Sequence, residues 1–475
     1  MKKILCGISI LLMANIFCPP VEAAEELVSG IGDQTAVEVT VYNSNIGLVK
    51  DQRTLTLKPG AHELRFMDVA SQIIPASVGM KSVTSPGSLQ ILEQNYEYDL
   101  LSSQKLLDKY VGQQVKLYSK NPYTDKEEIV TAELLANNGG EPVFRINDDI
   151  TFGYPGRLIF PKVPENLISK PTLVWSLDNK MASTQKIEVA YLTNGISWKA
   201  DYVLILDSKD KKADLSGWVT IENRSGAEYR NAHMKLVAGD VNRVREGYMI
   251  PAPTPAAYAN KAAAPSFKEE SFFEYHIYTL NRPSTIKQNQ TKQISLLDAG
   301  DIPVAKKFVY YGADYYYRNL YGDVMSKQKV GVYLEFVNKK EHHLGMPLPK
   351  GIVRVYKNDS EDSLQFTGED SIQHTPKDEK VKIKLGDAFD VTASRKQLTW
   401  EKIAKDTYET TIEVTLRNHK DEDIVVKVIE PIPGDWKILE SSCKAIKDDA
   451  ATAEFDLDVP KDGEAKLNFK VRVRF

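Results

Sequence analysis

The chain has 475 residues, with 61 lysine and arginine side chains against 65 aspartate and glutamate, and a formal net charge of -4 at pH 7. This mildly acidic balance argues against a nucleic-acid partner or an anionic lipid surface, because both need a basic patch on the protein. The length is sufficient for roughly two to four hydrophobic cores.

Residues 1–23 have the pattern of a cleavable secretory signal peptide. Two lysines precede an apolar run over residues 4–17 that is too short to span a bilayer, and small residues near position 23 occupy the sites that signal peptidase reads. We expect cleavage before Ala24 and a periplasmic or secreted protein. No second long apolar run follows, so we expect no transmembrane segment in the mature chain.

The cysteines give no framework for disulfides. The chain has 3 cysteines, and cleavage of the signal peptide would remove Cys6 and Cys18. Cys18 is a poor site for lipid attachment, because the bulky Phe17 precedes it. Cys443 alone would remain, so the mature protein must be stabilised by burial of its cores.

The first part of the mature chain has the periodicity of strands. Residues 34–99 open with alternating apolar and polar side chains, VEVTVYNSNIGLVKDQRTLTLKPGAHELRF, and we expect an N-terminal β-domain there. The range 101–111 has the spacing of a short helix, with Ser102 or Ser103 as its N-cap. Short strands between glycines and prolines follow, so residues 100–169 are expected to form a small inserted β-barrel.

The rest of the chain also alternates with a period of two. Apolar side chains recur at every second residue from Trp198 to Leu206, which predicts a strand in an antiparallel pair. We expect a central β-sandwich body over residues 170–395, with an exposed Ala/Pro linker at 251–265, and an immunoglobulin-like C-terminal sandwich over 396–475. The predicted fold class is therefore all-β with multiple sandwich units.

A weak internal repeat ends three of the predicted strands. VTIENRSGAE, YLEFVNKKEHH and VTLRNHKDED each run from an apolar strand into an asparagine, namely Asn223, Asn338 or Asn418, and then into a charged turn. Asparagine tolerates the left-handed conformation that such turns require. The pattern fits duplicated sandwiches and also fits independent use of the same turn chemistry.

Several long stretches resemble one bacterial family. They are the segment 191–244, the stretch QTKQISLLDAGDIPVAKKFVYYG, the stretch PLPKGIVRVYKND with the charged strands after it, and the opening strands of the mature chain. Together they resemble the family catalogued as domain of unknown function 4139, some members of which are mucoidy inhibitors. The resemblance implies a β-rich, extracytoplasmic protein and brings no catalytic residues. The long coiled-coil insertion of the mucoidy-inhibitor members is missing here, which argues against a mucoidy role.

The sequence lacks the linear motifs of common enzyme classes. It contains no GxSxG, HExxH, GxxxxGK(S/T), GxGxxG or EF-hand loop. Glu341-His342-His343 is the densest metal-like cluster, but neighbouring residues on a strand point to opposite faces, and a solvated turn is the simpler interpretation. We therefore expect no metal site and no cofactor.

A charged loop, GEDSIQHTPKD, contains the candidates for catalysis. If Pro376 folds this loop back, four side chains could converge as an acid and base pair or as ligands, and these are Glu369, Asp370, His374 and Asp378. The alternative is an ordinary charged loop surface.

A tract rich in tyrosine contains the candidates for binding. Exposed tyrosines on a β scaffold stack on sugar rings or fill the pockets of a protein partner. The candidates are Tyr310, Tyr311, Tyr315, Tyr316, Tyr317 and Tyr321. The alternative is that these rings belong to the core, as half-buried residues of a sheet often do.

These observations predict an exported cell-envelope protein that binds or scaffolds a glycan or another envelope protein without catalysing a reaction. The prediction rests on the signal peptide, the sandwich pattern and the missing catalytic motifs. The competing hypothesis is an envelope hydrolase acting on glycans, with carboxylates that only the fold brings together, about 5 Å or more apart as glycosidases require.

Overall fold

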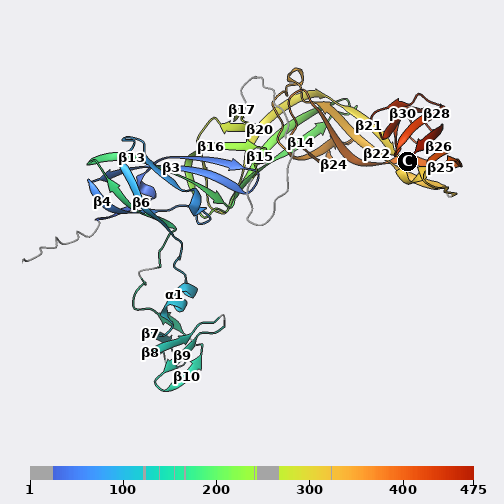
Figure 1. The fold of residues 1–475 in the computed structure, drawn as a ribbon. Helices are drawn as coiled ribbons and strands as arrows, with labels where there is room; N and C mark the ends of the chain where they lie inside the picture. Colours follow the sequence, from blue (N-terminus) through green and yellow to red (C-terminus); the bar gives the residue numbers. More distant parts are fainter. Residues whose placement is uncertain are drawn as a thin grey trace, which may run out of the picture. The chain divides into compact units, whose positions relative to one another are not determined.

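The computed structural model describes residues 25–475 apart from residues 121, 122, 124, 139, 154, 155, 165, 166, 240, 243–266 and 323 (Figure 1). The expected signal peptide, 1–23, and the Ala/Pro linker, 251–265, lie outside the described residues. Strands make up nearly all of the regular structure in the described part, so the all-β prediction is confirmed. No helix among the described residues has the length and apolarity needed to cross a membrane.

The chain divides into two compact units. The first consists of Met1–Thr35, Asp51–Ser71 and Pro75–Val189, and the second consists of Ala36–Lys50, Gln72–Ile74 and Ala190–Phe475. Three strands contribute residues to both units, and these are β2 (Gln34–Tyr42), β3 (Ile46–Leu57) and β13 (Ser183–Asn194).

The first unit contains a four-stranded sheet in the order β1-β4-β12-β6. Its strands are β1 (Glu25–Ser29), β4 (Gly60–Met67), β12 (Thr172–Asn179) and β6 (Leu89–Glu97), accompanied by β5 (Gly79–Ser82) and the 3-10 helices η1 (Ile31–Asp33) and η2 (Pro75–Ser77). β1 runs parallel to β4, whereas β12 runs antiparallel to β4 and β6. Alternate side chains of these strands face the core. There the rings of Phe66 and Trp175 pack edge to face, with their centroids 5.9 Å apart.

The inserted part of the first unit is an open sheet in the order β10-β9-β8-β7-β11, preceded by a helix. Its elements are α1 (Ser103–Tyr110), β7 (Gln114–Lys120), β8 (Glu127–Ala136), β9 (Val143–Ile146), β10 (Asp149–Phe152) and β11 (Arg157–Ile159). Ser102 caps α1, because its side chain accepts a hydrogen bond from the main-chain N–H of Lys105 at 3.2 Å, as expected from the sequence.

The barrel expected over residues 100–169 is therefore corrected to an open sheet. β10 and β11 lie at its two edges and do not pair with each other in the described residues. These edge strands have only 4 and 3 residues. A closed barrel pairs its first and last strands, and in the part described this sheet does not.

Three sheets of the described residues have most of their strands in the second unit. In the first, β18 (Tyr275–Leu280) lies between β17 (Phe267–Phe272) and β16 (Tyr229–Ala238), and β16 also pairs with β2 and with β19 (Ser284–Ile286). The second has the order β20-β15-β14-β23-β24 and consists of β20 (Gln290–Pro303), β15 (Lys212–Asn223), β14 (Ile196–Leu206), β23 (Gly351–Asn358) and β24 (Leu364–Ile372). β14 is the strand expected from Trp198 to Leu206, and its antiparallel partner is β15.

The third sheet has the order β28-β31-β26-β25-β22-β21-β27-β30-β29. Its strands are β21 (Ala305–Tyr311), β22 (Met325–Val337), β25 (Lys380–Ala404), β26 (Thr407–Asn418), β27 (Ile424–Pro431), β28 (Asp435–Ser441), β29 (Ile446–Lys447), β30 (Thr452–Val459) and β31 (Gly463–Arg474). The sheet folds over itself around a buried core, so that Phe455 of β30 stacks on Phe469 of β31 at 5.2 Å. β25 runs across the boundary expected between residues 395 and 396, and that boundary stays a prediction.

One pairing rule recurs along the chain. Among the described residues, four antiparallel strand pairs, β4–β12, β16–β18, β23–β24 and β27–β30, each have their first strand joined in parallel to an earlier strand of the chain. These earlier strands are β1, β2, β14 and β21, respectively. Each of these pairs therefore extends a sheet that begins with an earlier strand.

The three asparagines of the sequence repeat occupy equivalent places at the ends of β15, β22 and β26. Asn223, Asn338 and Asn418 are each 0% exposed. The side-chain oxygen of each accepts a main-chain N–H of the following turn. The side-chain amide of each donates to two carbonyl oxygens, one in that turn and one in the segment before a partner strand. For Asn418 these acceptors are Glu422 O at 2.8 Å and Pro460 O at 3.1 Å.

Candidate functional site

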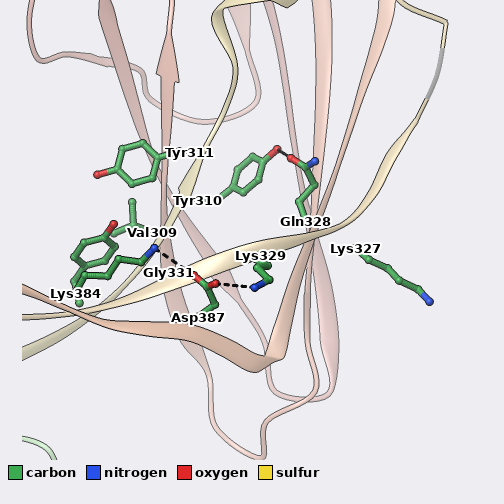
Figure 2. A pocket seen from close by; sticks show the side chains of 10 residues that line it. Val309, Tyr310, Tyr311, Lys327, Gln328, Lys329, Gly331, Lys384 and Asp387 are labelled. Carbon is green, nitrogen blue, oxygen red and sulfur yellow. Dashed lines mark hydrogen bonds and ion pairs between the residues drawn. The ribbon is translucent and has the colours of Figure 1, made fainter. Parts of the chain in front are cut away.

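A pocket of about 500 Å³ opens over β21, β22 and β25 in the third sheet of the second unit (Figure 2). β22 lies between the other two strands and is antiparallel to both. The pocket is lined by Val309, Tyr310, Tyr311, Lys327, Gln328, Lys329, Gly331, Tyr333, Lys384 and Asp387. Its size is typical of sites that hold small molecules.

Irregular pairing of β22 shapes the pocket. The register between β22 and β25 shifts between Met325 and Gln328, between Lys329 and Gly331, and again between Val332 and Tyr333. Each irregularity turns the following side chains away from the regular alternation of a strand. The bulges therefore direct neighbouring lysine and tyrosine side chains of β22 into one hollow.

Two tyrosine rings form the aromatic part of the pocket. Tyr311 is 50% exposed. Burial raises the pKa of Tyr333 to about 12, and the neighbouring Tyr311, through its charge and a hydrogen bond, acts in the same direction. Gly331 leaves room for the Tyr333 ring, because a Cβ at this position would lie 2.8 Å from Tyr333 Cε2. Lys382 Nζ lies 4.5 Å from the centroid of the same ring, within the range of a cation–π contact.

Two lysines and one carboxylate form the charged part of the pocket. Figure 2 shows Asp387 between Lys329 and Lys384, with Lys329 Nζ at 3.2 Å from Oδ2 and Lys384 Nζ at 3.5 Å from Oδ1. The hydrogen bond from Lys329 holds the pKa of Asp387 below its usual range, and the charge of Lys384 adds to this effect. Asp387 is therefore ionised at neutral pH and keeps both ammonium groups at the pocket.

The tyrosine candidates separate into buried and exposed rings. Tyr310, Tyr316 and Tyr317 are at most 2% exposed and belong to the C-terminal core. Tyr315 is 39% exposed but does not line the pocket. The exposed tyrosine ring that lines the pocket belongs to Tyr311. Tyr321, the sixth candidate, is partly buried and packs against the same core. Tyr310 also reaches the pocket wall, where its hydroxyl donates to Gln328 Oε1 at 2.9 Å.

The acidic and histidine candidates bond to separate partners. Glu369 forms an ion pair with Arg354 at 3.1 Å, and Asp370 Oδ2 accepts the main-chain N–H of Lys384 at 2.8 Å. The other two candidates lie beyond β24. His374 Nδ1 accepts the main-chain N–H of Lys350, and Asp378 Oδ2 lies 3.6 Å from Lys377 Nζ. Through Lys384, Asp370 is bonded to a residue of the pocket.

The cluster at residues 341–343 lies in and after the 3-10 helix η4 (Lys340–His342). Its two histidines bond to carbonyl oxygens, His342 Nδ1 to Val337 O at 3.2 Å and His343 Nδ1 to Gly300 O at 3.0 Å. In the described part of the chain, no group of three or more histidine, cysteine or acidic side chains could hold a metal ion.

The sequence also contained a signal for the charged side chains of the pocket. Lysines occupy alternate positions at Lys380, Lys382 and Lys384 of β25, and at Lys327 and Lys329 of β22. Such alternation on strands predicts a basic row on one face of a sheet. It does not identify which strands are neighbours, so the pocket could not be assembled from it.

Comparison with known proteins places these strands in a family. The model of the family described as "Domain of unknown function (DUF4139)" matches residues 187–475, which is more than half of the chain and includes every residue that lines the pocket. A search of curated proteins gives no match.

Proposed function

The chain belongs to the DUF4139 family, and on that premise we propose that it is an exported cell-envelope protein that binds an acidic glycan without catalysing a reaction. The binding site is the pocket over β21, β22 and β25. The observation that carries the proposal is the exposed ring of Tyr311 beside Lys329 and Lys384, both of which Asp387 holds in place. Export to the periplasm or outside the cell is part of the proposal and rests on the pattern of residues 1–23.

The aromatic part of the pocket suits a sugar ring. A half-exposed tyrosine offers a flat apolar face together with a hydroxyl, which matches the mixed apolar and polar surface of a sugar. Tyr311 has this exposure, and Tyr333 beside it is held by Gly331 and Lys382. Because these rings are already positioned, a bound sugar would order few side chains, which favours affinity.

The charged part of the pocket suits an acidic group on that sugar. The side chains of Lys329 and Lys384 are 79% and 50% exposed, so their ammonium groups can reach a ligand in the pocket. A carboxylate on the ligand would form charge-assisted hydrogen bonds with them. A neutral sugar gains none of this energy, so the pocket favours uronic acids over neutral hexoses.

The same geometry favours binding over hydrolysis. Glycosidases use a pair of carboxyl groups, one of which carries a proton at the working pH. Asp387 is the carboxylate among the residues that line the pocket, and its two lysine partners lower its pKa. Asp370 lies nearby but accepts the main-chain N–H of Lys384. The pocket thus provides no protonated acid for glycan cleavage.

Isothermal titration calorimetry with an oligogalacturonide, and with a neutral malto-oligosaccharide of equal length, tests the proposal. We expect the acidic oligomer to bind and the neutral one to give no heat. Tyr311→Ser and Lys384→Gln should each weaken binding at least ten-fold, which corresponds to about 1.4 kcal/mol. Added salt should weaken binding further, because the lysines are exposed to solvent.

Tyr315→Ser is the matched control. This ring is 39% exposed but does not line the pocket, so its loss should leave affinity within about two-fold, or about 0.4 kcal/mol. Thermal unfolding of all variants separates lost binding from lost structure. The proposal fails if neither oligomer binds, or if the control variant loses as much affinity as Tyr311→Ser.

A further inference from the structure

The second half of β25 occupies the same place in its sandwich as β14 does in an earlier one. β14 is antiparallel to β15, which ends at the buried Asn223, and Ile196 of β14 pairs with that asparagine. β25 is antiparallel to β26, which ends at the buried Asn418, and Val391 of β25 pairs with it. The pairing rule of the chain therefore predicts a parallel neighbour for this half of β25.

The edge that should carry that neighbour is unpaired. In β14 the residues paired in parallel with β23 begin at Ala200, four positions after Ile196, and end at Leu206. The corresponding part of β25 is 395–401. Its first residue pairs with β22, and beyond it no strand in the described part of the chain pairs with this edge.

The unpaired edge is also apolar at its surface. Leu398 is 44% exposed, and the loop before β22 adds Leu320 at 67% and Val324 at 52%. That loop contacts the edge through two buried side chains. The amide of Gln397 donates to Tyr316 O at 2.8 Å, and the guanidinium of Arg395 lies 4.0 Å from the centroid of the Tyr316 ring. Exposed edges of this kind pair with added strands.

The antiparallel pair β4–β12 presents the complementary arrangement. β4 has the position that β16, β23 and β27 have in their antiparallel pairs, and its parallel neighbour is β1, a strand of 5 residues. Unlike β14 and β21, β1 pairs with no second strand among the described residues. A short parallel strand held on one side is the easiest of the four parallel neighbours to exchange.

We propose that the β25 edge of one molecule pairs in parallel with β4 of a second copy, replacing β1 there and joining the molecules head to tail. The new contact repeats the intrachain rule, because an antiparallel pair, β4–β12, is added to a strand, β25, that already has an antiparallel partner in β26. The edge and the β4–β12 pair are different surfaces of the described chain, so the contact is heterologous and chains of molecules can grow.

Sedimentation velocity over a concentration series tests the assembly. The wild-type protein should form dimers and longer species as concentration rises. Leu398→Lys, which places a charge on the edge, should weaken association at least ten-fold, whereas Leu27→Pro, which disrupts β1, should strengthen it by a similar factor. The matched control is Phe389→Lys, because Phe389 is 95% exposed on the same strand but outside the segment that pairs.

Amine cross-linking of a mixture of ¹⁴N- and ¹⁵N-labelled wild-type protein identifies the surfaces in contact. Lys58, just before β4, should link to Lys396 or Lys402 of β25 in peptides that carry both isotopes. The proposal is overturned if wild type and Leu27→Pro both stay monomeric, or if the two lysine substitutions weaken association equally. Isotope-mixed links that avoid β4 and β25 would overturn it as well.

Discussion

Arg395 of β25 and Glu430 of β27 form an ion pair inside the C-terminal core, with Nη2 2.7 Å from Oε2 and both side chains at most 1% exposed. The hydroxyl of Tyr317 donates to the same carboxylate at 2.8 Å, and the guanidinium lies 4.0 Å from the centroid of the Tyr316 ring. A Cβ at Gly312 would overlap the carboxylate, so glycine is required beside it. The buried rings of the tyrosine tract therefore surround a charge pair.

Glu430→Gln should destabilise the protein by about 3–5 kcal/mol, because it leaves the buried guanidinium of Arg395 without its counter-charge. Replacing both partners, as Arg395→Met with Glu430→Leu, should cost less than the single change, since no buried charge remains. Urea unfolding of the three proteins measures the difference. As a control, Asp301→Asn breaks the exposed pair with Lys212 and should leave the free energy of unfolding nearly unchanged, because solvent screens that pair. A double variant less stable than Glu430→Gln would contradict this account.

Asn418→Asp should destabilise the C-terminal sandwich by about 1–3 kcal/mol. The carboxylate can still accept the main-chain N–H of Lys420, but it cannot donate to Glu422 O and Pro460 O. The equivalent changes at the two other repeat asparagines should act alike. Urea unfolding measures the loss, and Asn289→Asp, on an exposed turn with φ 56°, is the control that should stay within about 0.5 kcal/mol. Equal losses at Asn418 and at the control would refute a special role for the buried amide.

Local periodicity was enough to predict the strands but not their partners. The alternation from Trp198 to Leu206 placed β14 correctly, and the asparagine repeat marked three equivalent strand ends. β14 nevertheless pairs in parallel with β23, from a distant part of the sequence. No local pattern encodes that neighbour, because parallel pairing depends on which apolar faces meet during folding.

The tyrosine tract could not be resolved from sequence for a related reason. Tyr315, Tyr316 and Tyr317 do not alternate along a strand, because they lie in the 3-10 helix η3 (Asp314–Tyr317). There Tyr316 and Tyr317 point into the core, whereas Tyr315 is 39% exposed. The pocket residue Tyr333 was missed because the bulges of β22, rather than its sequence, bring it beside Tyr311.

Gly331→Ala should weaken binding of the acidic oligomer more than it weakens the fold. The added Cβ would lie 2.8 Å from Tyr333 Cε2, so the ring must move within the pocket. We expect at least a ten-fold loss of affinity by calorimetry, or about 1.4 kcal/mol. Gly386→Ala is the comparison. A Cβ at position 386 would meet no atom within 4 Å, but the backbone there has φ 151°, which alanine rarely adopts. This substitution should therefore lower the stability of the fold and leave affinity for the oligomer unchanged. If Gly331→Ala bound the acidic oligomer with unchanged affinity, the Tyr333 ring would not be part of the binding site.

Alkaline pH should destabilise the fold through Tyr333. Burial, reinforced by Tyr311, raises the pKa of Tyr333 to about 12, above the ordinary tyrosine value of about 10. Because folding favours the protonated phenol, its contribution to stability is fully present below about pH 10 and is lost as the pH rises through 12. Free energies of unfolding should therefore fall more steeply over this range in wild type than in Tyr333→Phe. The difference between their absorbance titrations at the phenolate band should show one phenol ionising near pH 12, and a midpoint near that of a free tyrosine amide would contradict the prediction.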